Sequence, residues 1–304
     1  MLNLYEQKPN TVDVLVLGTS TSFAGINTNV LWNDYGIAAY DLCCAEQGFW
    51  SSYYYLEEAL KLQTPSLILL DAKPSTYYED YTSDTRTILS TSGIRSPLTR
   101  INAINACVGS DRARNFILWM PEVHGNYRSV TWQDFVFPAD NEGRGNDWKG
   151  FIEYEETEQH QRPSLVWVST KKPMHAKEEE YVRKIFELAS EYDIPVQVVS
   201  LPNPDYGYDH MYVNSLAEIA KEYGASFANY NNPDLRFGLR YSSDFSDWQH
   251  LNVKGSVTFS KKLGQDLTEQ YDIPDRRGQE GYESYDTCAE KWFAAYPEYA
   301  DSEV

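Results

Sequence analysis

Short apolar runs alternate with longer segments of mixed polarity along the first part of the chain. The apolar runs cover residues 12–17, 37–43 and 66–70, and the first leads directly into a Gly-Thr-Ser turn at residues 18–20. A short continuous apolar run bounded by turn residues is typical of a strand buried in a parallel sheet. Helical segments separate the runs, so the pattern predicts a β-α-β-α-β unit with right-handed crossovers.

Glycine and proline mark where the expected helices end. A helix over residues 27–35 is closed by Gly36, and one over residues 51–62 is stopped by Pro65. The alternation resumes in the second half of the chain. There the pattern predicts a short strand at 164–169, core strands at 195–201 and 226–230, and helices at 176–192, 209–223 and 253–271.

Between these halves the regular alternation pauses. Helical pieces at 97–107 and 111–120 precede a turn-rich aromatic stretch at 124–148. We interpret residues 74–163, approximately, as an insertion that forms a lid or substrate wall, because no shift in composition marks a linker at either end. We therefore expect a single domain over residues 1–304.

The expected fold is a flavodoxin-like three-layer α/β/α arrangement. It has a central parallel five-stranded sheet and a large insertion after the third strand. A C-terminal extension from about residue 274 is acidic and aromatic, and it ends in a docking helix near residues 288–295.

Composition agrees with a folded, acidic domain. Of the 304 residues, 42% are hydrophobic, which is enough to bury a sizeable core, and 26 basic against 45 acidic residues give a net charge of −19. Such a surface repels nucleic-acid phosphates and anionic membranes, so we expect no nucleic-acid partner. The charge is better explained as a solubility feature than as a means of attracting a cationic substrate, although both explanations remain open.

The sequence contains no signature of a metal or nucleotide cofactor. The four cysteines, Cys43, Cys44, Cys107 and Cys288, match no zinc or disulfide spacing and are expected to be buried and inert. No His-Glu-x-x-His or phosphate-binding glycine motif occurs, so we expect neither metal nor cofactor. Without a secretory signal or a long apolar span, we expect no direct membrane insertion, although a domain cut from a longer anchored protein remains open.

Ser20 is the first candidate for chemistry. Ligands of open parallel sheets bind at the carboxyl ends of the strands, where this hydroxyl follows the first strand. A serine on such a turn combines a nucleophile with backbone N–H groups for an oxyanion. The motif alone also fits a helix cap. Ser22 is a weaker candidate nucleophile because it lies beyond the tight turn.

The second candidate is Asp247-x-x-His250, just before the last core helix. The spacing allows the carboxylate to accept a hydrogen bond from the imidazole, which orients the ring and stabilises its protonated form. A capping aspartate beside a surface histidine is the alternative explanation.

Together the two motifs resemble the SGNH (GDSL-type) hydrolase superfamily, in which a serine after the first strand pairs with a C-terminal Asp-x-x-His. Residues 16–32 and 40–56 are similar to bacterial envelope-associated SGNH-like proteins and to D-alanyl-transfer proteins. The resemblance covers residues 12–71 and 195–271. It implies an extracytoplasmic domain of an anchored protein, while a cytoplasmic location remains possible from the sequence.

The resemblance assigns roles to individual residues. Ser20 is the expected nucleophile, His250 the general base and Asp247 the orienting acid. Gly48 falls where the family places a backbone oxyanion donor, and the N–H of Ser20 is another.

One block of the family pattern is missing. The Gly-x-Asn-Asp expected after the third strand is replaced by residues 71–74 (DAKP), which removes an asparagine donor. Losing one donor costs about 10²-fold or more in rate. Gln47 or Asn126 is the expected substitute. Otherwise, the activity is modest or the reaction is a transfer.

The insertion supplies further candidates. His124, Asn126 and Arg128 are candidates to line the substrate cleft, with Arg128 holding a carboxylate or phosphate, although a plain surface loop is the favoured explanation of this segment. Many tyrosines and tryptophans lie in loop-like stretches, where exposed rings suit stacking on sugars and buried ones ordinary packing.

Three functions follow from these features. The first is a serine esterase that removes acyl groups, acetyl above all, from a carbohydrate or cell-envelope glycan. The second is an O-acyltransferase that modifies a cell-envelope polysaccharide. The third is a non-catalytic glycan-binding module on a degenerate SGNH fold.

Overall fold

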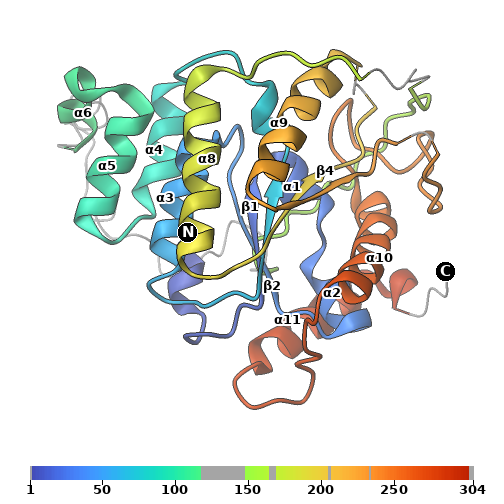
Figure 1. Cartoon of the computed structure of the whole chain (residues 1–304). Helices are drawn as coiled ribbons and strands as arrows, with labels where there is room; N and C mark the ends of the chain where they lie inside the picture. The colour runs from blue at the N-terminus through green and yellow to red at the C-terminus, as the bar shows by residue number, and fades with distance from the viewer. Residues whose placement is uncertain (1, 118–147, 164–168, 205–206, 233, 301–304) are drawn as a thin grey trace, which may run out of the picture.

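The computed structural model describes residues 2–117, 148–163, 169–204, 207–232 and 234–300 (Figure 1). Its centre is a sheet of five parallel strands in the order β2-β1-β3-β4-β5. The strands are β1 (Val14–Gly18), β2 (Ala39–Cys43), β3 (Leu67–Asp71), β4 (Val196–Ser200) and β5 (Ser226–Asn229). This is the flavodoxin-like strand order, which confirms the predicted fold class.

Alternate residues of the central strands enter two separate cores. In β1, Leu15 and Leu17 belong to one core, and Val14 and Val16 belong to the other. All five residues of β1 are buried, as expected for a parallel strand covered on both faces. The continuous apolar runs of the sequence follow from this two-sided burial.

Helices cover both faces of the sheet (Figure 1). The first core is closed by α3 (Phe49–Ala59), α8 (Ala176–Glu191) and α9 (His210–Glu222). The second is closed by α2 (Thr28–Tyr35) and α10 (Val253–Gln270), beside the short helix α1 (Ser20–Gly25). The remaining helices are α4 (Asp84–Ser92), α5 (Pro97–Val108), α6 (Ser110–Ile117), α11 (Glu283–Ala295) and 3₁₀ turns at Leu2–Glu6, Lys73–Thr76, Gly207–Asp209 and Pro297–Tyr299.

The observed helix ends agree with the predicted ones where the sequence contains a recognisable capping residue. Asn27 caps α2 by accepting from the N–H of Asn29, and Gly36 ends the helix with a φ of 68°. Two short helices, α1 and α4, were not predicted from the sequence. The helix that we expected over 51–62 is α3, which begins earlier, at Phe49, directly after Gly48 in an extended conformation.

The long segment after β3 contains α4, α5 and α6, with α5 against α3. Most of the predicted aromatic stretch at 124–148 and of the strand at 164–169 lies outside the described residues. Trp148 and Phe151, where the description resumes, pack with Trp292 of α11. The docking helix near the C-terminus is therefore confirmed, and it is longer than predicted.

All four cysteines are free, and Cys43 and Cys44 are half-buried, which corrects the expectation that all four are fully buried. In the part of the chain that the structure describes, no helix has both the length and the apolar character needed to cross a bilayer. The same residues contain no cluster of three or more His, Cys, Asp or Glu side chains suited to a metal ion.

Candidate active site

The turn after β1 gives Ser20 and Thr19 different tasks. Thr19 is the cap of α1, and its Oγ1 accepts a hydrogen bond from the N–H of Thr21 at 3.3 Å. The capping role that the sequence allowed for Ser20 therefore belongs to its neighbour. The hydroxyl of Ser20, which is half-buried at the carboxyl end of the sheet, is left to contact a different partner.

That partner is His250. Its Nε2 lies 2.7 Å from Oγ of Ser20, and its Nδ1 lies 2.7 Å from Oδ2 of Asp247. With the proton on Nδ1, the imidazole donates to the carboxylate and accepts from the serine hydroxyl. Three side chains that the sequence predicted to meet across 230 positions thus form one hydrogen-bonded chain.

Asp247 is held by its own loop. Its Oδ1 accepts from the backbone N–H groups of Gln249, at 2.8 Å, and His250, at 2.9 Å. Burial raises the pKa of Asp247, but the hydrogen bonds from the His250 ring and the two N–H groups outweigh that effect and lower the pKa overall. The carboxylate is therefore charged at neutral pH.

A second carboxylate, that of Asp71, holds the serine turn in place. Oδ2 of Asp71, at the end of β3, accepts from the Thr19 N–H at 3.0 Å, the Thr19 hydroxyl at 2.8 Å and the Thr21 hydroxyl at 3.0 Å. Its Oδ1 accepts from the Lys73 N–H at 2.8 Å. Asp71 therefore joins the ends of β1 and β3 through both residues that flank Ser20. Its place at the end of a strand was visible in the sequence, but its partners were not.

Glycine is required in front of this turn. A Cβ atom on Gly18 would lie 2.4 Å from Oγ of Ser22 and 2.6 Å from Cβ of Asp71. Ser22 is itself fully buried, and its hydroxyl has no partner in the described part of the chain. The structure thus brings His250 to Ser20 and leaves Ser22 inside the protein.

Tyr154 flanks the imidazole and was not identified from the sequence. Its ring stacks on His250 with centroids 5.1 Å apart and planes inclined by 22°. Although the stretch at 153–156 is acidic, Glu153 and Tyr154 are half-buried. No local pattern indicated this contact, because it joins the insertion to a loop almost a hundred residues away.

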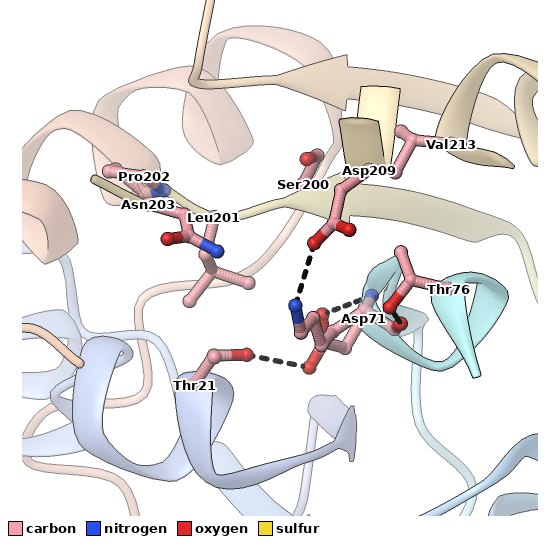
Figure 2. A pocket seen from close by; sticks show the side chains of 10 residues that line it. Thr21, Asp71, Thr76, Ser200, Leu201, Pro202, Asn203, Asp209 and Val213 are labelled. Atoms are coloured by element: carbon pink, nitrogen blue, oxygen red, sulfur yellow. Dashed lines mark hydrogen bonds and ion pairs between the residues drawn. The ribbon is translucent and has the colours of Figure 1, made fainter. Parts of the chain in front are cut away.

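A polar pocket lies next to the serine turn (Figure 2). It holds about 320 Å³ of empty space, and Thr21, Asp71, Lys73 and Asp209 contribute to its lining. Nζ of Lys73 lies 2.7 Å from Oδ2 of Asp209, and each side chain is 19% exposed. Asp209 makes no capping hydrogen bond at the start of α9 and pairs with Lys73 instead.

The predicted oxyanion residues have different surroundings. The backbone N–H groups of Ser20 and Gly48 donate to no protein acceptor within the described residues. Gln47 is buried, and its amide nitrogen donates to Ser52 Oγ at 2.9 Å and Leu42 O at 3.4 Å. Both N–H bonds of this amide are thus already used. The other predicted site residues, His124, Asn126 and Arg128, lie outside the described residues.

Comparison with known proteins yields distant structural likenesses. No protein-family profile matches the sequence. No curated protein matches it either. A GDSL-like lipase from Bacteroides thetaiotaomicron aligns with a TM-score of 0.41 and 11% identity, covering 85% of this chain and 88% of its own. A putative acylhydrolase from Bacteroides fragilis aligns with a TM-score of 0.39 and 13% identity over 86% of this chain and 90% of its own.

A gut microbial diltiazem-metabolizing enzyme aligns with a TM-score of 0.29 and 11% identity over 86% of this chain and 48% of its own. Similarities at this level carry no argument about activity. Any function for this chain has to be argued from the contacts of its own residues.

Proposed function

We propose that the protein is a serine-dependent hydrolase of acyl esters. The observation that carries the proposal is the hydrogen-bonded chain Ser20–His250–Asp247, with both links at 2.7 Å. A serine hydroxyl is a weak nucleophile until an adjacent base accepts its proton. Here the base, its orienting carboxylate and the hydroxyl are already in that order.

The reaction follows from this order. His250 takes the proton of Ser20 as Oγ attacks the ester carbonyl, and Asp247 stabilises the imidazolium that forms. The imidazolium then gives its proton to the leaving alcohol, which leaves an acyl-serine. Water, deprotonated by His250, attacks the acyl group, and Ser20 regains its proton as the acid departs.

The negative oxygen of each tetrahedral intermediate needs donors. The N–H groups of Ser20 and Gly48 are our candidates, since neither has an acceptor within the described residues. We do not carry Gln47 forward, because its amide hydrogens are used in the interior. With two backbone donors in place of three donors, we expect a modest rate.

Hydrolysis of p-nitrophenyl acetate tests the proposal. Ser20→Ala should lower kcat by at least about 10³-fold and should abolish covalent labelling by a fluorophosphonate probe. Ser190→Ala, an exposed serine near the end of α8, is the matched control and should behave like wild type. Wild-type turnover by Ser20→Ala would end the proposal.

We further propose that the alcohol part of the ester is a carbohydrate. Trp248 lies between Asp247 and His250 in sequence and is 52% exposed. A large exposed indole beside a reaction centre provides a flat apolar surface for the face of a sugar ring. The acetyl group is the acyl group that we favour.

Trp248→Ala tests the carbohydrate assignment. We expect KM for an O-acetylated oligosaccharide to rise about tenfold relative to KM for p-nitrophenyl acetate, because only the former has a ring to stack. Tyr192→Ala is the control. Tyr192 is equally exposed at 52%, but it follows α8 and precedes β4, at the amino-terminal edge of the sheet. An unchanged ratio of the two KM values would contradict the assignment.

O-acyl transfer is the second candidate, because Lys73 stands in the segment after β3 where an asparagine donor was expected. Slow hydrolysis lengthens the life of an acyl-serine and favours an alcohol acceptor over water. Acyl groups appearing on an added glycan would identify transfer, and free acid alone would identify hydrolysis. Sugar binding without any labelling of Ser20 would instead point to a non-catalytic glycan-binding module.

A further inference from the structure

A second pocket lies in the connection between β5 and α10. It is open to solvent, has about 270 Å³ of empty space, and is separate from the polar pocket beside Ser20. Two guanidinium groups, of Arg162 and Arg236, line it together with the aromatic rings of Tyr230, Phe237 and Tyr241. Two cations in one pocket stand out in a protein with a net charge of −19.

Arg162 is held in place by neutral groups. Its Nη2 donates to the carbonyl oxygens of Asn232, at 3.2 Å, and Leu235, at 3.1 Å. No carboxylate of the described residues forms an ion pair with it. Backbone carbonyls orient a guanidinium without neutralising it, so Arg162 keeps its full charge toward the pocket.

The remaining hydrogens of Arg162 decide which anion fits. A carboxylate binds a guanidinium in a fork that uses Nη2 together with Nη1 or Nε. Both Nη2 hydrogens already point to carbonyl oxygens, so both forks are lost. Nε–H and the Nη1 hydrogens are left for single hydrogen bonds, which the several oxygens of a phosphate can accept from separate donors.

Tyr241 adds a neutral donor to the two cations. The guanidinium carbon of Arg162 lies 5.7 Å from the centroid of its ring. Burial raises the pKa of Tyr241, and the charges of Arg162 and Arg236 only partly oppose this, so the phenol stays protonated. On the Tyr230 side of the pocket, Asp266 accepts from the Tyr230 hydroxyl and pairs with Lys262 at 2.6 Å.

We propose that this pocket binds the phosphate group of a small phosphorylated molecule, such as a sugar phosphate. Arg162, Arg236 and Tyr241 would hold the phosphate oxygens, and the rings of Tyr230 and Phe237 would contact the attached group. The site requires no reaction at Ser20, so it stands or falls independently of the esterase proposal.

Isothermal titration calorimetry at fixed ionic strength tests the site in the intact chain. The probes are inorganic phosphate, glucose 1-phosphate and glucuronate. We expect saturable binding of the two phosphates and weaker binding of glucuronate, the carboxylate probe. Tighter binding of glucose 1-phosphate than of phosphate identifies a sugar phosphate as the source, and equal binding identifies free phosphate.

Variants then locate the binding. Arg162→Gln should weaken phosphate binding about 10- to 100-fold, as expected for losing hydrogen bonds to a charged group. Because Arg162 also anchors a loop, Arg236→Gln and Tyr241→Phe provide a second test. The control is Arg183→Gln, since Arg183 forms exposed ion pairs with Glu179 and Glu222 on the other side of the sheet.

Ser20→Ala should bind phosphate like wild type, which separates this result from any failure of the hydrolase proposal. Absence of saturable phosphate binding by the wild-type protein would overturn the inference. Binding that survives both Arg162→Gln and Arg236→Gln would place the anion elsewhere, and tighter binding of glucuronate would overturn the preference for phosphate.

Discussion

The ring of Tyr154 lies flat against the imidazole of His250, with centroids 5.1 Å apart. The carbonyl oxygen of Tyr154 also accepts a hydrogen bond, at 2.9 Å, from the N–H of Val253, the first residue of α10. Two residues earlier, the Ile152 N–H donates to the carbonyl of Phe23 in α1, at 2.8 Å. The segment around Tyr154 therefore ties the helix of the candidate nucleophile to the loop of the candidate base.

Replacing Tyr154 tests whether the stack positions His250. Tyr154→Leu should lower kcat about tenfold, because the imidazole loses the surface that fixes its plane and the π-face beside its developing charge. Tyr154→Phe keeps the ring and should restore most of the rate. Equal rates for Tyr154→Leu and wild type, in a protein whose activity depends on Ser20, would show that the stack is only structural.

Asp247→Asn tests the orienting carboxylate. An amide in this position favours the wrong tautomer of His250, which should lower kcat by about 10³- to 10⁴-fold with little change in KM. The exposed Asp272 supplies the matched control, since Asp272→Asn changes the net charge equally. We would abandon the triad if both variants hydrolysed p-nitrophenyl acetate at similar rates.

Asp71→Asn tests the carboxylate under the serine turn. Four N–H or O–H groups donate to Asp71, and an amide NH₂ would oppose at least one of them. We expect a loss of about 1–3 kcal/mol in the free energy of unfolding, measured with urea, and a lower kcat because the turn that presents Ser20 relaxes. A variant as stable and as active as wild type would contradict this role.

Glu178 should make stability depend on pH. Burial raises its pKa to about 8, although the Phe49 N–H and the charge of Lys177 oppose the shift. An unfolded glutamate ionises near pH 4.3, so between about pH 4.5 and 8 the folded state holds one more proton than the unfolded state. The contribution of Glu178 to the free energy of unfolding is therefore complete below the pKa of the unfolded glutamate. It falls as pH rises toward 8, by up to about 1.4 kcal/mol per pH unit.

Glu178→Gln removes that dependence. The amide oxygen can still accept from the Phe49 N–H, which Glu178 binds at 2.7 Å. Urea unfolding at a series of pH values should therefore show the variant gaining on wild type from about pH 5 to 8. A constant difference between the two proteins over this range would mean that Glu178 is ionised in the folded state.

Much of the fold was accessible from the sequence for a simple reason. Strands buried on both faces require continuous apolar runs, and those runs give the β-α-β order directly. Helix starts were less accurate where tertiary contacts set them. Glu178, which is 129 residues away along the chain, accepts the first N–H of α3, and no local pattern near Phe49 contains that information.

The candidate site divides in the same way. Ser20, Asp247 and His250 carry their chemistry in residue type and in position at strand and helix ends, so a sequence can identify them. Tyr154 and Asp71 act through contacts between segments, and their types are common elsewhere in the chain. Only the folded arrangement distinguishes Tyr154 from the other 23 tyrosines.

The bonds from Ile152 and Tyr154 limit how this fold can be shortened by an engineer. A truncated variant that joins β3 directly to α8 would keep the whole sheet and all three side chains of the candidate triad. It would nevertheless lose the two hydrogen bonds that connect α1 to the start of α10 through Ile152 and Tyr154. A minimal version of the protein must therefore retain the stretch from Gly150 through Tyr154. Gly150 has a φ of 92°, and a Cβ atom there would lie 2.0 Å from the carbonyl oxygen of Asp41.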